Sequence, residues 1–213
     1  SLLRASELDA EYISGAYAVH FPGMLLELTE EMRGACERLV EIAREKGILV
    51  SFDPNIRREL SADAAARARL LWAVRHADVV APTLSEGQMI TGETSIGDVL
   101  RALHAMGPRV VALTRDKDGA VLSRGGEVAV AAGIDEEPVD PTGAGDTLAA
   151  ALCVGLQEDM PLARLAAFCN CAGTLVIKKK GAIGMALPER GQVDAMVASG
   201  VCRVECMPLE SLV

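Results

Sequence analysis

A glycine-rich turn runs directly into a helical pattern in the stretch EEPVDPTGAGDTLAAALCVGL, residues 136–156. Gly143 and Gly145 have no Cβ, so backbone N–H groups can converge on a ligand here, and the start of a helix adds positive potential. Asp146 follows at once and places a carboxylate beside this anion hole. The combination suits phosphoryl transfer, because the amides stabilise charge on the transferred group while the carboxylate accepts a hydroxyl proton.

The same residues also have a purely structural interpretation. Asp146 could cap the N-terminus of the helix, with the glycines only turning the chain. Two features count against this: Thr142 is already available as a capping residue, and a Gly-Ala-Gly entry leaves more room than a cap requires. Short glycine motifs are common, so residue chemistry alone leaves both interpretations open.

The composition limits the kind of protein that carries this motif. The chain has 213 residues, of which 50% are hydrophobic and only 3% aromatic, so its core must consist of Ala, Leu, Val and Ile. This length can bury the core of one domain or at most two, and the composition is typical of helices packed on a parallel sheet. A net charge of −9 argues against a nucleic-acid partner.

The cysteines and the apolar runs indicate the compartment. Six cysteines never form a C-x-x-C pair, and with only three scattered histidines they favour reduced thiols over a zinc site. The longest apolar stretch, 148–156, is too short to span a bilayer, and no charged-then-apolar leader opens the chain. We therefore expect a cytoplasmic protein with no membrane partner.

Apolar runs alternate with helical patterns along the chain, which predicts a parallel sheet covered by helices on both faces. An antiparallel hairpin is expected at one edge of this sheet, around Gly125. The expected strands are 16–21, 48–52, 78–82, 109–114, 119–123 and 127–132, and the expected helices are about 32–43, 62–77, 85–91, 95–106, 144–157, 161–179 and 189–199.

The stretch DPTGAGDTLAAALCVGL resembles the C-terminal signature of the ribokinase-like (PfkB) carbohydrate kinases. The resemblance implies a ribokinase-like three-layer α/β/α fold with a mostly parallel central sheet and an edge β-hairpin. It implies that residues 1–213 form a single α/β domain, the nucleotide-binding and catalytic portion of a sugar kinase, in which the family's N-terminal strands and lid are missing. Four further segments match the family in order and spacing: SFDPNIRREL, HADVVAPTLSEGQMITG, VVALTRDKDGAVL and FCNCAGTLVIKKKGA.

The resemblance implies roles for individual residues, with ATP and Mg²⁺ as cofactors. Asp146 would be the catalytic base, and the backbone amides of Gly143, Ala144 and Gly145 would form the anion hole. At the nucleotide, Thr114, Lys117 and Gly119 would line the pocket, and Asn170 would lie near the adenine. Glu86 would help organise Mg²⁺. Asp140 and Thr142 would lie where some members of the family hold a monovalent cation such as K⁺.

The substrate side of the site is expected just after the strand at 48–52. Asp53, Asn55 and Arg57 follow that strand in a segment that resembles a loop of 2-keto-3-deoxygluconate kinases and fructokinases. A guanidinium at Arg57 suits bidentate capture of a carboxylate, which favours 2-keto-3-deoxygluconate as the substrate, with fructose as the alternative. Arg57 as an ordinary surface arginine stays open.

Several residues depart from the family pattern or have simpler roles. Thr83 stands where the family's acidic motif usually begins with Asn, and Asp116 replaces a glycine that is usual in the nucleotide turn. Glu86 could be an ordinary helix-start acid, and Asn170 a hydrogen-bonding residue at the edge of the core. These features leave a second hypothesis, a non-catalytic binding protein that has lost its lid. A homodimer of the full-length protein is a further expectation.

Overall fold

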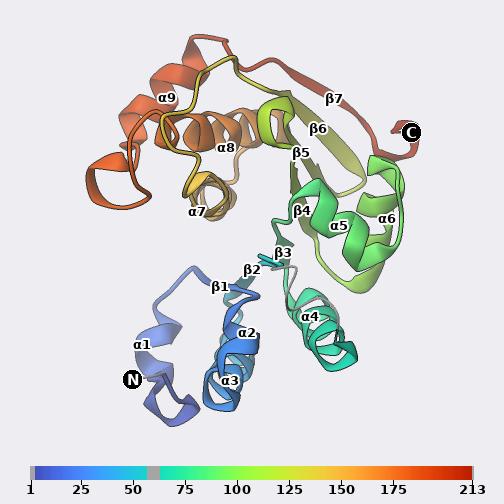
Figure 1. Ribbon diagram of the computed structural model, residues 1–213, viewed down its shortest axis with the longest axis vertical. Helices are drawn as coiled ribbons and strands as arrows, with labels where there is room; N and C mark the ends of the chain where they lie inside the picture. The colour runs from blue at the N-terminus through green and yellow to red at the C-terminus, as the bar shows by residue number, and fades with distance from the viewer. Residues whose placement is uncertain (1–2, 57–62, 213) are drawn as a thin grey trace. The chain divides into compact units, whose positions relative to one another are not determined.

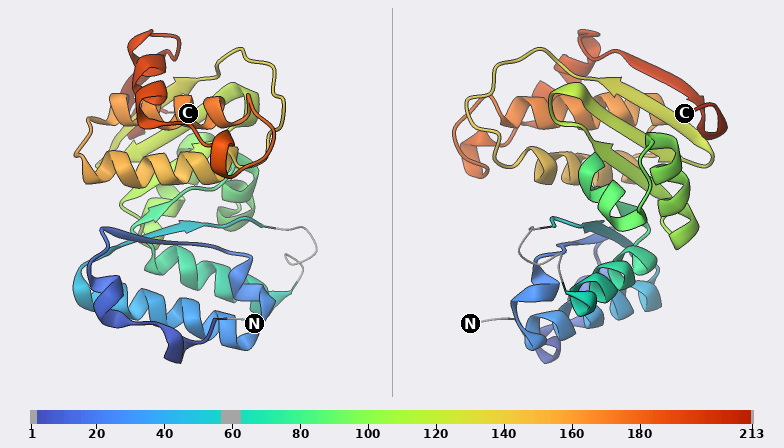
Figure 2. Two further views of the ribbon diagram at one scale, coloured as in Figure 1. Left: turned by 90° about the vertical axis from the view of Figure 1, so that its left-hand side faces the viewer. Right: turned by 45° about the vertical axis from the view of Figure 1, so that its right-hand side comes forward.

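The computed structural model describes residues 3–56 and 63–212. The chain divides into two compact units, Ser1–Val111 and Ala112–Val213, each of which is described by itself (Figures 1 and 2). Strand β4 (Val110–Thr114) runs across the boundary between them. The single α/β domain expected over 1–213 stays a prediction.

The N-terminal unit is built on parallel strands. Strands β1 (Ala18–Pro22), β2 (Leu49–Asp53) and β3 (Val79–Val80) pair side by side, and β3 pairs in turn with the start of β4. Around them lie a 3₁₀ turn at Ala5–Glu7 and the helices α1 (Ala10–Ser14), α2 (Leu25–Leu28), α3 (Glu30–Lys46), α4 (Ala64–His76), α5 (Leu84–Thr91) and α6 (Ile96–Met106).

The strands of this unit lie in its core. Val50, Phe52 and Val80 are almost completely buried, as expected for parallel strands covered on both faces. The rings of Phe21 on β1 and Phe52 on β2 pack with their centroids 5.2 Å apart. The end of β2 is thereby held firmly, which fixes the point from which the Asp53 loop leaves the sheet.

The expected start and stop signals of α3 are confirmed. The Thr29 hydroxyl accepts a hydrogen bond of 3.2 Å from the Met32 amide at the start of the helix. Gly47 ends the helix with φ 69°, a left-handed conformation that glycine adopts without steric cost. Gly92 ends α5 in the same way, with φ 80°.

Over residues 112–212 the C-terminal unit combines antiparallel strands with three helices. Strands β5 (Gly119–Arg124) and β6 (Glu127–Ala132) form the expected hairpin, and β7 (Val204–Pro208) adds to β6. The hairpin is therefore not the edge of the sheet, and that part of the expectation is wrong. Along the sheet, neighbouring strands are hydrogen-bonded in chain order from β1 to β7. The helices are α7 (Ala144–Gln157), α8 (Leu162–Val176) and α9 (Arg190–Ala198), with 3₁₀ turns at Asp116–Asp118, Gly184–Ala186 and Leu209–Ser211.

Helices α7 and α8 run side by side in this unit (Figure 2). Leu152 of α7 and Leu165 of α8 are completely buried, and Leu165 packs so closely on α7 that a Cβ at Gly155 would lie 2.3 Å from its Cδ1 atom. Gly173 permits a close approach, because a Cβ at this position would lie 3.4 Å from the Ala144 carbonyl oxygen. This packing positions the first turn of α7, which carries the motif at 143–146.

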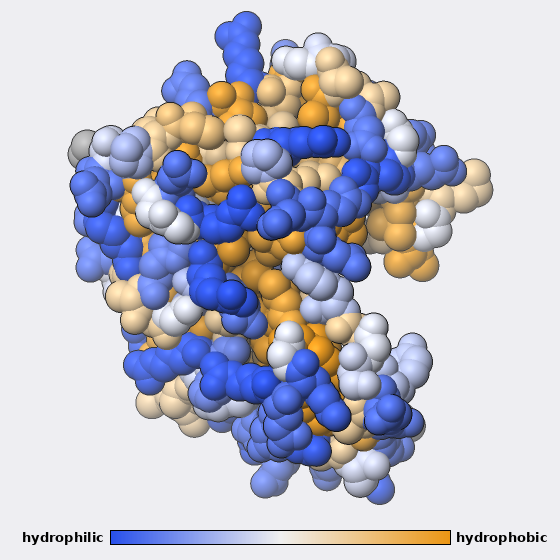
Figure 3. Space-filling view, turned by 180° about the vertical axis from the view of Figure 1, so that it is seen from behind, coloured by the Kyte–Doolittle hydropathy of each residue, from blue (hydrophilic) through white to orange (hydrophobic). Residues whose placement is uncertain are grey.

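The surface is mixed in character. Hydrophilic and apolar side chains alternate over the face shown in Figure 3, in keeping with a chain that is 24% charged and 50% hydrophobic. Within residues 3–56 and 63–212, none of the helices has the length and apolar character needed to cross a membrane.

Candidate active site

The first turn of α7 begins at a glycine that cannot be replaced without strain. Gly143 is the N-cap residue, with φ 86° and ψ 2°, a left-handed conformation that is costly for residues with a side chain. A Cβ at this position would lie 2.6 Å from the Cβ of Ala182, which is in the loop after α8. Backbone conformation and close packing therefore both require glycine here.

No side chain of the described residues caps the start of α7. The expectation that Thr142 is available as the cap is wrong, because Gly143 occupies the capping position and the Thr142 amide instead donates a 3.0 Å hydrogen bond to Asp140 Oδ1. The capping interpretation of Asp146 also fails, since its carboxylate accepts no capping hydrogen bond. Among the described residues the amides of Gly145 and Asp146 have no partner and are left available to a ligand, whereas the Ala144 amide donates a long hydrogen bond of 3.4 Å to the Pro141 carbonyl.

Gly145 and Asp146 lie at the open side of this turn. A Cβ at Gly145 would have no neighbour within 4 Å, so this glycine leaves free space at the helix start. Asp146 is exposed and lines an open cavity of about 350 Å³ together with Thr147, Phe168 and Arg190. The Thr147 hydroxyl is buried and has no hydrogen-bonding partner among the described residues. A carboxylate and a set of open amides therefore share one helical turn.

Asp140 ties the loop before α7 to the loop after α8. Its Oδ1 accepts from the Thr142 amide and its Oδ2 accepts a 2.9 Å hydrogen bond from the Gly181 amide. The backbone strengthens this link, because the amides of Val139 and Asp140 donate to the Ile177 carbonyl at 2.8 and 3.1 Å. Hydrogen bonds from the Thr142 side chain and from the Gly181 and Thr142 amides lower the pKa of Asp140 to about 2. The carboxylate is therefore ionised and holds the motif in place.

The turn between β4 and β5 brings together the residues expected at the nucleotide. Thr114 ends β4, Lys117 lies exposed in the 3₁₀ turn, and Gly119 begins β5 with φ 89°. A Cβ at Gly119 would lie 2.3 Å from the Ala131 carbonyl oxygen, so glycine is required at this point of the hairpin. Asp116 has φ 50°, the left-handed conformation in which glycine is favoured and Asp is tolerated. This explains how an aspartate can replace the usual glycine, and the side chain is exposed.

Asn170 is buried on α8 and bonds to the end of β6. Its Nδ2 donates to the Ala132 carbonyl at 2.9 Å and to the sulfur of Cys202 at 3.4 Å. The side chain thus acts as a hydrogen-bonding residue at the edge of the core, which was the simpler of its two interpretations. No described residue bonds to its Oδ1, which is the atom left for a ligand.

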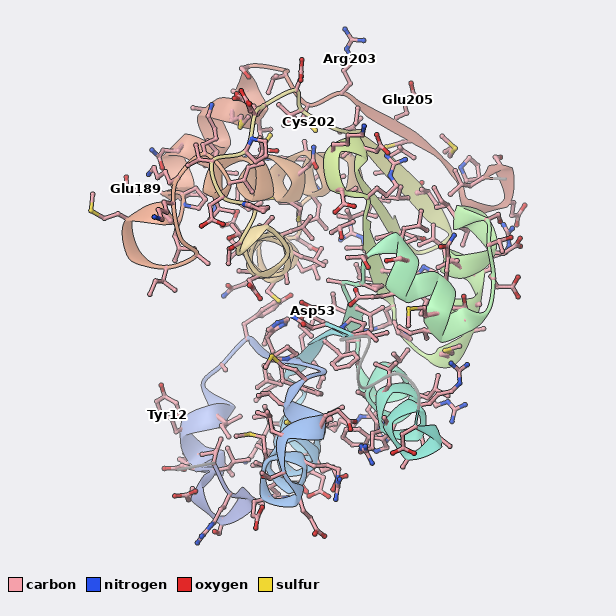
Figure 4. All side chains as sticks on the ribbon, viewed as in Figure 1. Tyr12, Asp53, Glu189, Cys202, Arg203 and Glu205 are labelled. Carbon is pink, nitrogen blue, oxygen red and sulfur yellow. The ribbon has the colours of Figure 1, made fainter. Side chains whose placement is uncertain are left out.

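The loop after β2 is held by the carboxylates of Asp53 and Glu86 in the N-terminal unit. Asp53 Oδ1 accepts a 3.0 Å hydrogen bond from the Asn55 amide, and Asn55 adopts a left-handed φ of 39°. This local turn leaves β2 at the position labelled in Figure 4. A small cavity of about 80 Å³ adjoins it, lined in part by Asn55, Arg67 and Glu27. Arg57 lies outside the described residues.

Glu86 has a structural task in the same unit. It completes a capping box at the start of α5, in which its Oε2 accepts from the Thr83 amide at 2.8 Å and from the Thr83 hydroxyl at 2.9 Å. Its Oε1 accepts a 2.6 Å hydrogen bond from the Ile56 amide. Thr83 therefore replaces Asn as a working helix cap. Oε2 accepts two hydrogen bonds and Oε1 accepts one, so a lone pair of Oε1 is left that could bind water around a metal.

Sequence reasoning missed the partners that lie far along the chain. Ala182 and Gly181 shape the motif through contacts with Gly143 and Asp140, yet they follow it by about forty positions. The small Gly-Ala pair after three lysines was the one signal that could have drawn attention to them. Among the described residues, no group of three or more His, Cys, Asp or Glu side chains is arranged to hold a metal.

Comparison with known proteins defines the class. The model of the pfkB family of carbohydrate kinases matches residues 3–190. The chain therefore belongs to this family. It is similar to Fructokinase-1 of Zea mays, with 32% identity over 215 residues that cover 92% of this chain and 63% of the maize protein.

Solved structures agree with the fold. An Escherichia coli protein solved as a candidate ribokinase II with ATP and Mg²⁺ superposes with a TM-score of 0.86 at 23% identity, over 92% of this chain and 63% of that one. Fructokinase from Vibrio cholerae, bound to fructose, ADP and a calcium ion, gives a TM-score of 0.79 at 27% identity, over 92% and 64%. The fold is thus the ribokinase-like α/β fold that was expected. The chain spans somewhat less than two thirds of the length of these relatives.

Proposed function

We propose that the protein carrying this chain is an ATP-dependent sugar kinase of the fructokinase type, and that this chain supplies its phosphoryl-transfer machinery. The observation that carries the proposal is the first turn of α7. There, a left-handed Gly143, an open Gly145 and amides without a side-chain cap share one turn with the exposed carboxylate of Asp146. Membership of the pfkB family supports this assignment.

In the proposed reaction, Asp146 accepts the proton of the attacking sugar hydroxyl. The amides of Gly143, Ala144 and Gly145 stabilise the negative charge that develops on the transferred γ-phosphoryl group, and the helix dipole acts in the same direction. Because Asp146 is exposed at the open cavity, a hydroxyl can reach it without displacing a structural hydrogen bond. Mg²⁺, when bound with ATP, neutralises the phosphate oxygens.

The nucleotide would lie along the β4–β5 turn. Thr114 and Gly119 would line its pocket, and Lys117 would contact the phosphates from the exposed 3₁₀ turn. Asn170 would contribute its Oδ1 to the adenine, because its Nδ2 is engaged by Ala132 and Cys202. Glu86 would orient water around Mg²⁺ through the lone pair of Oε1 that the Ile56 amide does not use.

A monovalent cation such as K⁺ would bind beside Asp140 and Thr142. The ionised Asp140 carboxylate supports this part of the proposal, because its two oxygens have lone pairs beyond those used by the amides of Thr142 and Gly181. A cation here would add positive potential near the loop that leads into α7.

Fructose is the proposed substrate, and the earlier preference for 2-keto-3-deoxygluconate is not kept. The maize relative is named a fructokinase, and the Vibrio structure contains fructose. The preference for a sugar acid rested on Arg57, which lies outside the described residues. Asp53, which ends β2, and Asn55, in the loop that follows, would contribute to the sugar side of the site. Asp116 no longer favours the non-catalytic hypothesis. This aspartate adopts the left-handed conformation of the glycine that it replaces.

Coupled ADP release by the full-length protein tests the proposal. ATP should be consumed with fructose far faster than with 2-keto-3-deoxygluconate or ribose, and binding of ATP should be measured in parallel. Faster turnover of the sugar acid would overturn the substrate. ATP binding without turnover of any sugar would favour a non-catalytic protein instead.

A further inference from the structure

An open hollow lies where the parallel strands of the N-terminal unit begin. It is lined by Tyr17, which precedes β1, by Leu49 at the start of β2, by Asp78, which precedes β3, and by Arg109, which precedes β4. Its volume is about 660 Å³, within the range of about 300–1,000 Å³ that is usual for small-molecule sites. In open α/β sheets the catalytic crevice lies at the carboxyl ends of the strands. Asp53 is at that end of β2, so the hollow is at the opposite end of the strand from the proposed sugar site.

Backbone hydrogen bonds hold the floor of the hollow. The Leu49 amide donates to the Tyr17 carbonyl at 3.1 Å, and the Arg109 amide donates to the Asp78 carbonyl at 2.8 Å. The Asp78 amide in turn donates to the Val50 carbonyl at 2.9 Å. The side chains that line the hollow therefore start from fixed positions on neighbouring strands, and groups carried by regular elements are held more precisely than groups on loops.

The hollow carries an excess of positive charge in a chain whose net charge is −9. Of the described residues that line it, three are basic, Arg44, Lys46 and Arg109, and one is acidic, Asp78. The Asp78 carboxylate is already engaged, because its Oδ2 accepts from the Val50 amide at 3.0 Å and its Oδ1 accepts from Arg109 at 3.1 Å. It therefore does not neutralise the other two basic groups.

Arg44 and Lys46 are the free cations of this hollow. Both are exposed in the last turn of α3, and neither forms an ion pair within residues 3–56 and 63–212. Cations are favourable at this end of a helix because of the helix dipole. Arg75 is exposed in the last turn of α4 in the same way but does not line the hollow. It is therefore a matched control for a cation whose task is only to end a helix.

We propose that this hollow binds a small phosphate monoester. Such an ester carries about two negative charges at pH 7, which Arg44 and Lys46 can balance. Guanidinium groups bind phosphate oxygens through paired hydrogen bonds, and Arg109 has further N–H groups beyond the one that it gives to Asp78. The ring of Tyr17, which is 41% exposed, offers a surface to the neutral part of the ester. This binding does not depend on the phosphoryl transfer proposed above.

The test measures the binding of fructose 6-phosphate to the full-length protein by isothermal titration calorimetry. ADP and fructose are present in excess, so that the proposed active site is occupied. We expect the ester still to bind, and the double variant Arg44→Gln with Lys46→Gln to bind it at least about tenfold more weakly, since charge-assisted hydrogen bonds are lost. Arg75→Gln should bind it as tightly as the wild type does, and urea unfolding checks that each variant is folded.

Three results would overturn the proposal. The first is the absence of binding when ADP and fructose are in excess, and the second is equal binding by the double variant and the wild type. The third is binding of inorganic phosphate as tight as that of the ester, because the hollow would then recognise only the anion.

Acetylation of lysines by acetic anhydride gives a second measurement on the unmodified protein, so no variant needs to fold. With ADP and fructose again in excess, fructose 6-phosphate should slow the acetylation of Lys46, which mass spectrometry of the peptides reports. Lys178, an exposed lysine of the C-terminal unit, should react at an unchanged rate. An unchanged rate at Lys46, or equal protection of both lysines, would contradict binding in the hollow.

Discussion

Gly143 offers a direct test of the geometry at the start of α7. Replacing it with Ala forces a side chain into a left-handed conformation and places its Cβ 2.6 Å from the Cβ of Ala182. Carbon atoms in contact normally lie about 3.5–4.0 Å apart, so the loop after α8 or the helix start must move. The Asp140–Gly181 hydrogen bond joins the same two loops and resists that movement.

The magnitude follows from two costs and one gain. The left-handed conformation costs an alanine about 1–2 kcal/mol, and overpacking typically adds about 1–3 kcal/mol. The lower entropy of the unfolded alanine chain offsets about 0.4–1 kcal/mol. The free energy of unfolding should therefore fall by about 1–4.5 kcal/mol, which for a domain of this size lowers Tm by roughly 2–18 °C.

Gly145→Ala is the matched control, because its Cβ would have no neighbour within 4 Å and its φ is ordinary. Its stability should change by no more than about 1 kcal/mol, since Ala is the better helix former. Its turnover should nevertheless fall at least about tenfold, because a methyl group would intrude where the phosphoryl group is held. Urea unfolding and coupled ADP release of both variants measure these effects. Equal stability of Gly143→Ala and the wild type would refute the described geometry.

Three further predictions concern the neighbouring residues. The pKa of Asp140 is about 2 in the folded protein and about 4 in the unfolded chain, so its contribution to stability is complete above about pH 4 and is lost as the pH falls toward about 2. The difference in the free energy of unfolding between wild type and Asp140→Asn, measured by urea titration, should therefore shrink over that pH range. An unchanged difference would argue against the Asp140 contacts. Glu86→Gln keeps only one acceptor oxygen and should lower the free energy of unfolding by about 1 kcal/mol; no loss would show that the capping box is unimportant. Lys117→Met should raise the KM for ATP about tenfold or more without changing the KM for fructose, because a charge-assisted contact is worth about 1.5–3 kcal/mol; the reverse pattern would remove Lys117 from the nucleotide site.

Helices and parallel strands were predictable because their signals are local. The expected bounds of α7 match the structure, Thr29 begins α3, and Gly47 and Gly92 end α3 and α5, as their residue types indicate. Strand β7 was missed because all five residues of VECMP are exposed or half-buried and the stretch contains no apolar run. The short helices before residue 30 were missed for the same reason, since each buries only one residue, Ile13 in α1 and Leu26 in α2.

In the candidate site, too, the local features could be predicted from the sequence and the long-range contacts could not. The glycines and Asp146 could be identified because they are consecutive and their chemistry is local. The cap was wrongly assigned to Thr142, since nothing local shows that the left-handed Gly143 takes the capping position. The contacts of Asp140 with Gly181 and of Asn170 with Cys202 join residues distant in sequence, so only the folded chain brings them together.

The central claim is that Asp146 is the base in phosphoryl transfer at the start of α7. The most direct measurement is fructose-dependent ADP release by the full-length Asp146→Asn protein, compared with Asp135→Asn, a matched change at an exposed aspartate in the loop after β6. The amide keeps the shape of the side chain but cannot accept the proton, so turnover should fall at least about 10²–10⁴-fold. ATP affinity should stay within a few-fold, and Asp135→Asn should behave as wild type. Near-normal turnover of Asp146→Asn would contradict the claim.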